Sequence, residues 1–147
     1  MTGISYTLRQ ATQEDFPAIR ELINRVHINP ADLDWHRFIV AVDSSGQMLG
    51  CGQLKPHGAG IVELASIAVQ SSFRNQGIAR AIIEDLIAKA PRPLYLTCRS
   101  GLKSLYEKWG FQVVEGKELP RYYRRLAKLA SMITWMIGEH LLVMKLS

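Results

Sequence analysis

The sequence predicts a single α+β domain in which a mixed sheet is flanked by helices. Three strand-like segments joined by short turns run from residue 38 to residue 69, and strands with such short connections pair antiparallel. A helical crossover then links the strand-like segments 61–69 and 93–98 and is long enough for parallel pairing. The chain of 147 residues has the length of one domain with one sizeable core. We therefore treat residues 1–147 as one domain.

The first elements follow from alternation and helical spacing. Residues 6–10 alternate in polarity and predict the first strand. Thr12 and Asp15 have the spacing of a capping box, and apolar residues that recur at helical spacing predict a helix over about residues 15–26. Residues 31–37 could form a short second helix before the next strand begins.

The remaining elements follow from the same two patterns. Turn-forming residues separate the three adjacent strands, which we place at residues 38–42, 48–54 and 61–69. Apolar residues at helical spacing predict helices over about residues 77–90, 102–109 and 122–137. Short apolar runs predict further strands at residues 93–98, 111–114 and 140–146. The result is one mixed sheet whose strands are connected by helices and turns.

Composition and charge narrow the classes of partner. Hydrophobic residues make up 48% and charged residues 21% of the chain, which is typical of a globular protein and not of a disordered one. The net charge is +5. Residues 1–60 hold five Lys or Arg against six Asp or Glu, whereas residues 61–147 hold thirteen against seven. This excess predicts an anionic ligand for the second part. The densest basic cluster, residues 121–128, is short, so we expect no nucleic-acid partner.

Cysteine usage and apolar runs exclude several further classes. Cys51 and Cys98 are too few for a disulfide framework, and both lie in apolar, strand-like stretches, so we expect buried free thiols. No CxxC or HxxxH spacing occurs, and we expect no metal. The N-terminus lacks the features of a signal peptide, and no window approaches a membrane span. We expect a soluble, cytoplasmic protein.

The segment between the predicted central strand and the following helix carries the strongest chemical signal. Arg74, Gly77 and Ala79 have the spacing R-x-x-G-x-A at a helix N-terminus, where free N–H groups and the helix dipole bind phosphate oxygens. Neither a nucleotide P-loop nor a dinucleotide fingerprint fits, since Ile82 stands where the latter needs a small residue. On its own the spacing also fits an ordinary glycine N-cap beside solvated arginines.

The same segment resembles the pyrophosphate-binding motif of the GNAT superfamily of acetyl-CoA-dependent N-acetyltransferases. The resemblance rests on the strand 63–69 (ELASIAV) followed by residues 74–79 (RNQGIA). A second match, residues 105–111 (LYEKWGF), is similar to the family's L-Y-E-K-x-G-F segment. The order of elements along the whole chain agrees. Residues 98–100 and 118–122 are similar to the cyanobacterial and plastid branch of the family.

This resemblance implies the family's fold and its co-substrate. The fold is an α/β/α sandwich-like arrangement in which a mixed, mostly antiparallel sheet of about six to seven strands has a splayed central parallel pair. Acetyl-CoA would lie in the gap, and the backbone N–H of Ala68 would polarise the thioester carbonyl. The implied cofactor-binding residues are Ile67, Ala68, Val69, Arg74, Asn75, Gln76, Gly77, Ile78, Ala79 and Arg80. The chain departs from the family at Arg99, which stands where relatives often carry Asn.

Two proton transfers need side chains. An alkylamine with a pKa near ~10 must lose a proton before it attacks, and the departing thiolate must gain one. Tyr106 occupies the family's position for the acid, although it could also be a packed helical tyrosine. Glu63 is the carboxylate on the first splayed strand and could act as base, directly or through a water; alternatively it faces solvent at the strand end. Thr97 stands where some relatives carry an acid.

The acceptor is the least determined part of this hypothesis. Tyr122, Tyr123 and Trp135 could line an apolar pocket, with Tyr122 or Tyr123 near the cleft mouth. Glu115 and Glu118 could attract an amine cation, whereas the basic helix over residues 122–137 could also simply pack. The expected partners are acetyl-CoA and an amine, either an arylalkylamine or a protein lysine or N-terminus, and the chain could be a monomer or a homodimer. Three functions compete: an active acetyltransferase, a non-catalytic acyl-CoA-binding regulatory domain of the same fold, and a nucleic-acid-binding module.

Overall fold

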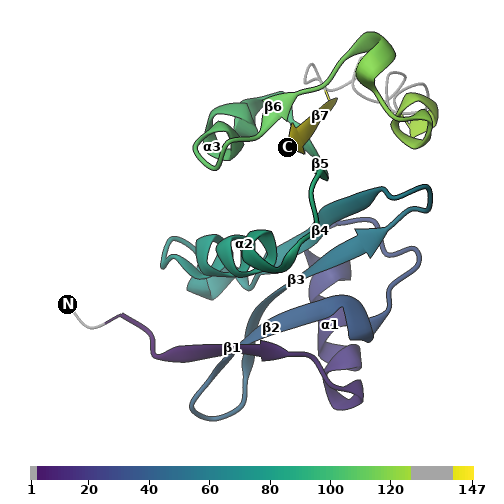
Figure 1. Cartoon of the computed structure of the whole chain (residues 1–147). Helices are drawn as coiled ribbons and strands as arrows, with labels where there is room; N and C mark the ends of the chain where they lie inside the picture. The colour runs from purple at the N-terminus through teal and green to yellow at the C-terminus, as the bar shows by residue number, and fades with distance from the viewer. Residues whose placement is uncertain (1–2, 127–140) are drawn as a thin grey trace. The chain divides into compact units, whose positions relative to one another are not determined.

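The computed structural model describes residues 3–126 and 141–147 (Figure 1). The greater part of the predicted helix 122–137 therefore lies outside the described residues. The chain divides into two compact units, and each is described separately below. The first unit holds residues up to 55 together with 64–90, and the second holds residues 56–63 and 91–147.

The described strands form one mixed, seven-stranded sheet in the order β1-β2-β3-β4-β5-β7-β6. β4 and β5 pair parallel through Val62↔Leu94 and Glu63↔Tyr95, which confirms the predicted parallel pair. The ladders β1–β2, β2–β3, β5–β7 and β6–β7 are antiparallel. The strands are β1 Tyr6–Gln10, β2 Phe38–Asp43, β3 Met48–Pro56, β4 Val62–Val69, β5 Leu94–Arg99, β6 Gln112–Val113 and β7 Leu141–Leu146. The fold class is thus the one that the sequence predicts.

In the first unit, the sheet packs between two helices, α1 (Phe16–Arg25) and α2 (Ile78–Lys89) (Figure 1). One core cluster joins α1 to residues of β2, β3 and β4 and contains Ile19, Leu22, Ile23, Phe38, Val40, Val42, Met48, Cys51 and Ala68. The glycines on either side of Cys51 face the other way, as strand alternation requires. A Cβ on Gly52 would lie 2.7 Å from Ile82 of α2, so α2 packs directly on the backbone of β3.

The region before β2 differs from its prediction. Residues 31–37 do not form a helix throughout; a single 3-10 turn, Trp35–Arg37, is capped by the side chain of Asp34, which accepts from the His36 N–H. The preceding residues are held in turn conformations. The Asn29 side chain accepts from the N–H of Ala31, and Asp32 has a left-handed φ of 54°. These local bonds compete with a helical turn.

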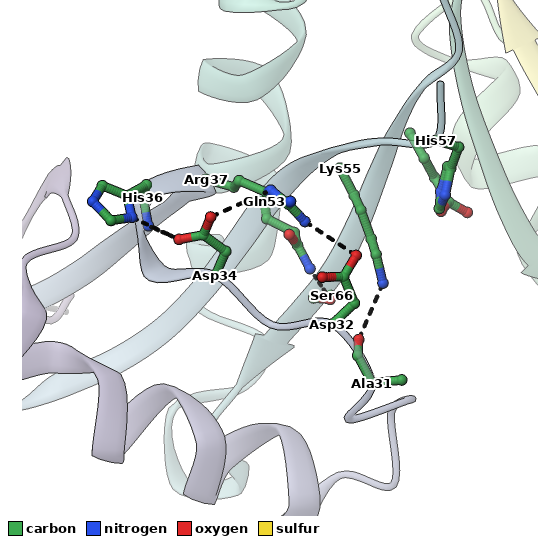
Figure 2. Close-up of polar contacts among 10 residues, drawn as sticks. Ala31, Asp32, Asp34, His36, Arg37, Gln53, Lys55, His57 and Ser66 are labelled. Atoms are coloured by element: carbon green, nitrogen blue, oxygen red, sulfur yellow. Dashed lines mark hydrogen bonds and ion pairs between the residues drawn. The ribbon is translucent and has the colours of Figure 1, made fainter. Parts of the chain in front are cut away.

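The same segment is tied down by side chains of the first unit (Figure 2). Lys55 Nζ donates to the carbonyl of Ala31 over 3.1 Å. Arg37 forms ion pairs with Asp32 over 3.4 Å and with Asp34 over 3.8 Å. At the other end of the unit, the predicted capping box is present, because the Thr12 N–H donates to Asp15 Oδ2 over 2.7 Å.

In the second unit, β5, β7 and β6 carry helical segments on both faces of the sheet. Residues 103–107 form the short helix α3 (Lys103–Glu107), which follows a 3-10 turn at Ser100–Leu102 and is shorter than predicted. Residues 121–126 begin the next helix. A small core contains Tyr95, Tyr123 and Val143, with Ile61, Leu119 and Leu126 packed around it.

Both cysteines are buried and free, as predicted. Cys51 belongs to the first unit and Cys98 to the second. Burial raises the pKa of the Cys51 thiol to about 12, so that this thiol is protonated at neutral pH and is not a nucleophile. None of the helices among residues 3–126 and 141–147 has the length and apolar character that a membrane crossing requires.

Candidate active site

The loop of residues 74–80 in the first unit contains two residues with a left-handed backbone conformation. Asn75 and Gly77 both adopt left-handed conformations, with φ of 63° and 81°, and α2 begins at the next residue, Ile78. A Cβ built on Gly77 would meet nothing within 4 Å. The glycine therefore fits because of its backbone conformation, which other residues rarely adopt, and the space beside it is open.

The side chains of this 74–80 loop divide into an anchor and an exposed rim. Ile78 is 1% exposed and fixes the start of α2 in the core. Arg74, Asn75 and Gln76 are exposed, and within the described part of the chain Arg74 forms no ion pair. Arg80 is exposed and pairs with Glu84 over 3.0 Å. The loop therefore offers the free N–H groups of a helix start and an unpaired guanidinium, which is a combination that suits phosphate oxygens.

The strand before this loop, β4, is irregular. Ser66 has a φ of 58°, which is rare for a residue with a side chain and marks a local break in the strand. Gln53 Nε2 donates to Ser66 Oγ over 2.8 Å (Figure 2). The predicted cofactor residues Ile67, Ala68 and Val69 follow at once, and Ala68 is 4% exposed. The loop and this strand end are thus brought together in the first unit.

Glu63 lies at the centre of a buried polar cluster in the second unit. Its carboxylate accepts from His57 Nε2 over 2.6 Å and from the Thr97 hydroxyl over 3.4 Å. The side chains of His57 and Glu63 are 7% and 10% exposed. The alternative in which Glu63 faces solvent at a strand end is therefore wrong. Parallel pairing with Tyr95 explains the contact, because Thr97 follows on the same face of β5.

Two tyrosines complete this Glu63 cluster, which we define as His57, Glu63, Thr97, Tyr122 and Tyr123. The ring of Tyr122 stacks on that of His57 with a centroid distance of 4.0 Å and an interplanar angle of 19°. Tyr123 presents its edge to His57 at 6.2 Å. Burial, followed by the charge of Glu63, raises the pKa of both tyrosines, so that both are neutral.

The two tyrosines differ in exposure, although the sequence predicted the same role for both. Tyr122 is 38% exposed, as a residue at a cleft mouth should be, whereas Tyr123 is fully buried. For Tyr123 the prediction of a position near a cleft mouth is wrong. Successive residues of a helix point roughly 100° apart, so only one of them can face solvent. The Tyr123 hydroxyl is buried without a hydrogen-bond partner.

Tyr106 lies on α3 in the same unit but approaches β5 from its other face. Its ring contacts Trp109 and Phe111, with centroid distances of 6.0 Å and 6.1 Å. Burial and the neighbouring Cys98 raise the pKa of the Tyr106 hydroxyl, which is therefore a neutral proton donor at pH 7. Because Cys98 and Thr97 are successive residues of a strand, their side chains lie on opposite faces. Tyr106 and Glu63 are thus not brought together.

His57 is the residue that the sequence analysis missed. It lies at the entrance of the turn before β4, where its N–H donates to the carbonyl of Ile61 over 2.9 Å. That turn brings residue 57 beside residue 63 on the returning strand. The six-residue spacing of His57 and Glu63 across a glycine-rich turn was the signal that could have identified the pair.

Two acidic residues expected to attract an amine lie elsewhere in the second unit. Glu115 and Glu118 line an open depression of about 410 Å³ together with Lys103, Val113 and Leu142. Lys103 offsets part of their charge, and no residue of the Glu63 cluster lines this depression. Among the described residues, no group of three or more His, Cys, Asp or Glu is arranged to hold a metal ion.

Known structures share this architecture. N-acetylglutamate synthase from Neisseria gonorrhoeae, solved with coenzyme A and L-arginine, matches 97% of this chain with a TM-score of 0.71 and 22% identity. The chain spans 33% of that enzyme. An acyl-CoA N-acyltransferase from Pseudomonas aeruginosa matches 98% of this chain and 99% of its own length, with a TM-score of 0.71 and 19% identity. At these identities the likeness shows the fold.

A third structure and the sequence comparisons complete the findings. The protein Rv2747 from Mycobacterium tuberculosis, in complex with CoA, matches 93% of this chain and 97% of its own, with a TM-score of 0.69 and 20% identity. Curated protein sequences gave no match. The family model of the acetyltransferase (GNAT) domain matches residues 34–113, which is more than half of the chain and includes the 74–80 loop, Glu63 and Tyr106. The chain belongs to the GNAT acetyltransferase family.

Proposed function

We propose that this protein is an N-acetyltransferase that transfers the acetyl group of acetyl-CoA directly to a primary amine. The observation that carries the proposal is the family match over residues 34–113, which contains a phosphate-suited loop, a neutral half-buried tyrosine and a buried carboxylate. The loop supplies a binding site for an anionic co-substrate, and the two side chains supply a proton donor and a proton acceptor. These are the parts that the reaction needs.

The first unit would bind acetyl-CoA through its backbone. The open space beside Gly77 admits a pyrophosphate, and the N–H groups at the start of α2 and the exposed Arg74 would contact its oxygens. Ile67, Ala68 and Val69 would contact the pantetheine arm through strand backbone. The N–H of Ala68 would then donate to the thioester oxygen as negative charge develops on it. Ile78 contributes its backbone, since its side chain is in the core.

In the second unit, Tyr106 would protonate the departing thiolate. A thiol of CoA is a weaker acid than a carboxylic acid but a stronger one than a phenol. The Tyr106 hydroxyl, whose pKa is raised, therefore remains protonated until the C–S bond breaks. Its ring is fixed between Trp109 and Phe111, which orients the hydroxyl at little entropic cost.

The carboxylate of Glu63 would belong to the base that removes a proton from the amine. It is buried and hydrogen-bonded by His57 and Thr97, an arrangement that holds it in one position. Thr97 thereby takes a supporting role at the position where some relatives carry an acid. The half-exposed ring of Tyr122 next to this cluster would form part of the acceptor wall, and an aromatic amine or the alkyl chain of a lysine would pack on it.

Two measurements test this proposal in order. Saturating acetyl-CoA should stabilise the protein, by about 2.7 kcal/mol at a concentration one hundred times Kd, and a thermal shift reports this binding. Release of free CoA is then followed with a panel of arylalkylamines, lysine-containing peptides and peptide N-termini. We expect CoA release with at least one of these classes. Binding without release for any amine would support the non-catalytic acyl-CoA-binding alternative, and absence of binding would overturn both functions.

A further inference from the structure

We propose that His57 is the group that takes the proton from the amine, and that Glu63 acts through it as a positioning residue. The inference rests on the proposed function and concerns one step of it. Its basis is the geometry of the Glu63 cluster, in which a nearly buried imidazole and a nearly buried carboxylate form a direct contact of 2.6 Å. A histidine held in this way has the properties of a general base.

The contact defines which ring nitrogen is available. A carboxylate only accepts hydrogen bonds, so His57 Nε2 must carry the proton that it donates to Glu63 Oε1. In the neutral ring the lone pair is then on Nδ1. Within the described residues Nδ1 forms no hydrogen bond, and it is not among the enclosed polar atoms that lack a partner. Nδ1 is thus the basic atom of the pair that an acceptor can reach.

Both oxygens of the carboxylate already have a partner, whereas the imidazole keeps one nitrogen without a hydrogen bond. Glu63 Oε1 is occupied by His57, and Glu63 Oε2 accepts from the Thr97 hydroxyl over 3.4 Å. An amine proton that went directly to this carboxylate would weaken the contacts that hold it in place, and lost contacts in a buried site are costly. Through the imidazole, the carboxylate keeps both contacts and still stabilises the proton that the ring receives.

The surroundings favour the imidazolium that the step creates. Glu63 faces the ring from β4, Thr97 lies beside the carboxylate on β5, and Tyr122 and Tyr123 face the ring from the helix that begins at residue 121. Burial raises the pKa of both tyrosines, which are therefore neutral, so the carboxylate of Glu63 is the acidic group that faces the ring. The negative carboxylate and the stacked face of Tyr122 both attract a cation.

The proton balance of the step is complete without another reactant. The ammonium form of the acceptor gives one proton to His57 Nδ1, and the freed lone pair forms the C–N bond to the thioester carbon. The C–S bond then breaks, and the thiolate takes the proton of Tyr106. The second proton lost by the nitrogen restores Tyr106 through solvent, and His57 returns its own proton to solvent. One ammonium ion and one acetyl-CoA thus give one amide, one CoA thiol and one proton.

A purely structural role for the pair makes a different prediction. In that case the His57–Glu63 contact would only hold the turn before β4, and any side chain that donates to Glu63 would preserve activity. His57→Gln separates the two roles, because its amide nitrogen can donate to Glu63 as Nε2 does, but the amide has no basic atom. His36→Gln is the matched control, since His36 also contacts a carboxylate, Asp34, over 2.7 Å but is 68% exposed and lies in the first unit.

The test measures CoA release at varied pH with the full chain and its best acceptor. We expect His57→Gln to lower kcat by about 10²-fold or more, the range for a lost general base, and to remove the acid-side fall in rate, while melting temperature and acetyl-CoA affinity stay near wild type. His36→Gln should retain wild-type kcat. An active wild type with His57→Gln within twofold of it would overturn this inference alone, whereas an inactive wild type would overturn the proposed function and this step together.

A measurement on the unmodified protein covers the case in which His57→Gln does not fold. With ring-¹⁵N-labelled histidine, long-range ¹H–¹⁵N NMR shows which nitrogen of His57 carries the proton, and the ring signal that changes in Glu63→Gln is assigned to His57. We expect the Nε2–H form with Nδ1 unprotonated at neutral pH, and a change of that pattern in Glu63→Gln. A proton on Nδ1 in the neutral ring would overturn the inference, because the lone pair would then face Glu63.

Discussion

The 74–80 loop and the Glu63 cluster differ in the groups that they offer to a ligand. In the loop, Arg74, Asn75 and Gln76 are exposed, and the features suited to binding are backbone conformations and free N–H groups. In the cluster, His57 and Glu63 are nearly buried, and the features suited to chemistry are side-chain contacts with defined partners. Each region lies in a different unit.

This difference predicts which property of the protein a substitution alters in each region. An exposed loop loses little stability on substitution, so its variants should alter affinity for the anionic co-substrate while the protein stays folded. A buried polar cluster is sensitive to any lost partner. Variants of the Glu63 cluster should therefore alter either turnover or stability, depending on which residue is replaced. The following variants test this division, from the largest expected effect to the smallest.

Tyr106→Phe should have the largest effect. The change deletes one hydroxyl and keeps the ring that packs against Trp109 and Phe111. Turnover should fall roughly 10²–10⁴-fold, the range for a positioned proton donor, with acetyl-CoA affinity unchanged in calorimetry. Tyr6→Phe, on β1 and outside both regions, is the control. If Tyr106→Phe turned over as fast as wild type, water or another group would have to protonate the thiolate.

Substitutions of Tyr123 should change the stability of the protein and not its binding of the acceptor amine. Tyr123→Ala removes a fully buried ring and should lower the free energy of unfolding by about 3 kcal/mol in urea titrations. Tyr123→Phe should leave stability equal or higher, by up to about 1 kcal/mol, because the hydroxyl that it removes has no hydrogen-bond partner. A clear loss of stability in Tyr123→Phe would show that this hydroxyl does find a partner in solution.

Gly77→Glu should weaken acetyl-CoA binding by at least about tenfold, or ~1.4 kcal/mol. It places a side chain and a negative charge in the open space where the pyrophosphate is proposed to lie. Gly46→Glu is a matched control, since Gly46 also has a left-handed φ, of 87°, with nothing within 4 Å of a built Cβ. The backbone strain is then common to both variants. Equal affinity of the two for acetyl-CoA in calorimetry would remove the loop from the co-substrate site.

Tyr122→Ala should have the smallest effect of the four. The ring is 38% exposed and stacks on His57, so its removal costs little stability. As part of the acceptor wall it should raise KM for the amine by about threefold, while KM for acetyl-CoA stays constant, because only binding of the acceptor is lost. Two-substrate kinetics measure both constants. An equal rise in both would contradict a role specific to the acceptor.

The same comparison explains what the sequence could predict. The 74–80 loop was predictable because its features are local: a glycine, an arginine at fixed spacing and a strand–helix boundary. The Glu63 cluster was only half predictable. Glu63 could be identified from its strand, but its burial depends on Thr97, which is distant in sequence, and on His57, whose approach depends on how a turn closes.

Two misplaced expectations have the same physical origin. A helix over residues 31–37 follows from composition, but side-chain bonds from Asn29 and Asp34 favour turns there. Tyr122 and Tyr123 are identical in sequence terms, and only the packing of the helix against Tyr95 and Val143 decides that Tyr123 is buried. Tertiary contacts thus decide cases in which local preferences are nearly equal.

Transfer of a labelled acetyl group tests the central claim most directly. The protein is incubated with acetyl-CoA labelled with ¹³C in the acetyl group and with the amine panel, and product amide and free CoA are measured by mass spectrometry. We expect multiple turnovers, with one labelled amide formed for each CoA released and with both strongly reduced in Tyr106→Phe. Acetyl-CoA that binds to the wild-type protein but keeps its label with every amine would contradict the account.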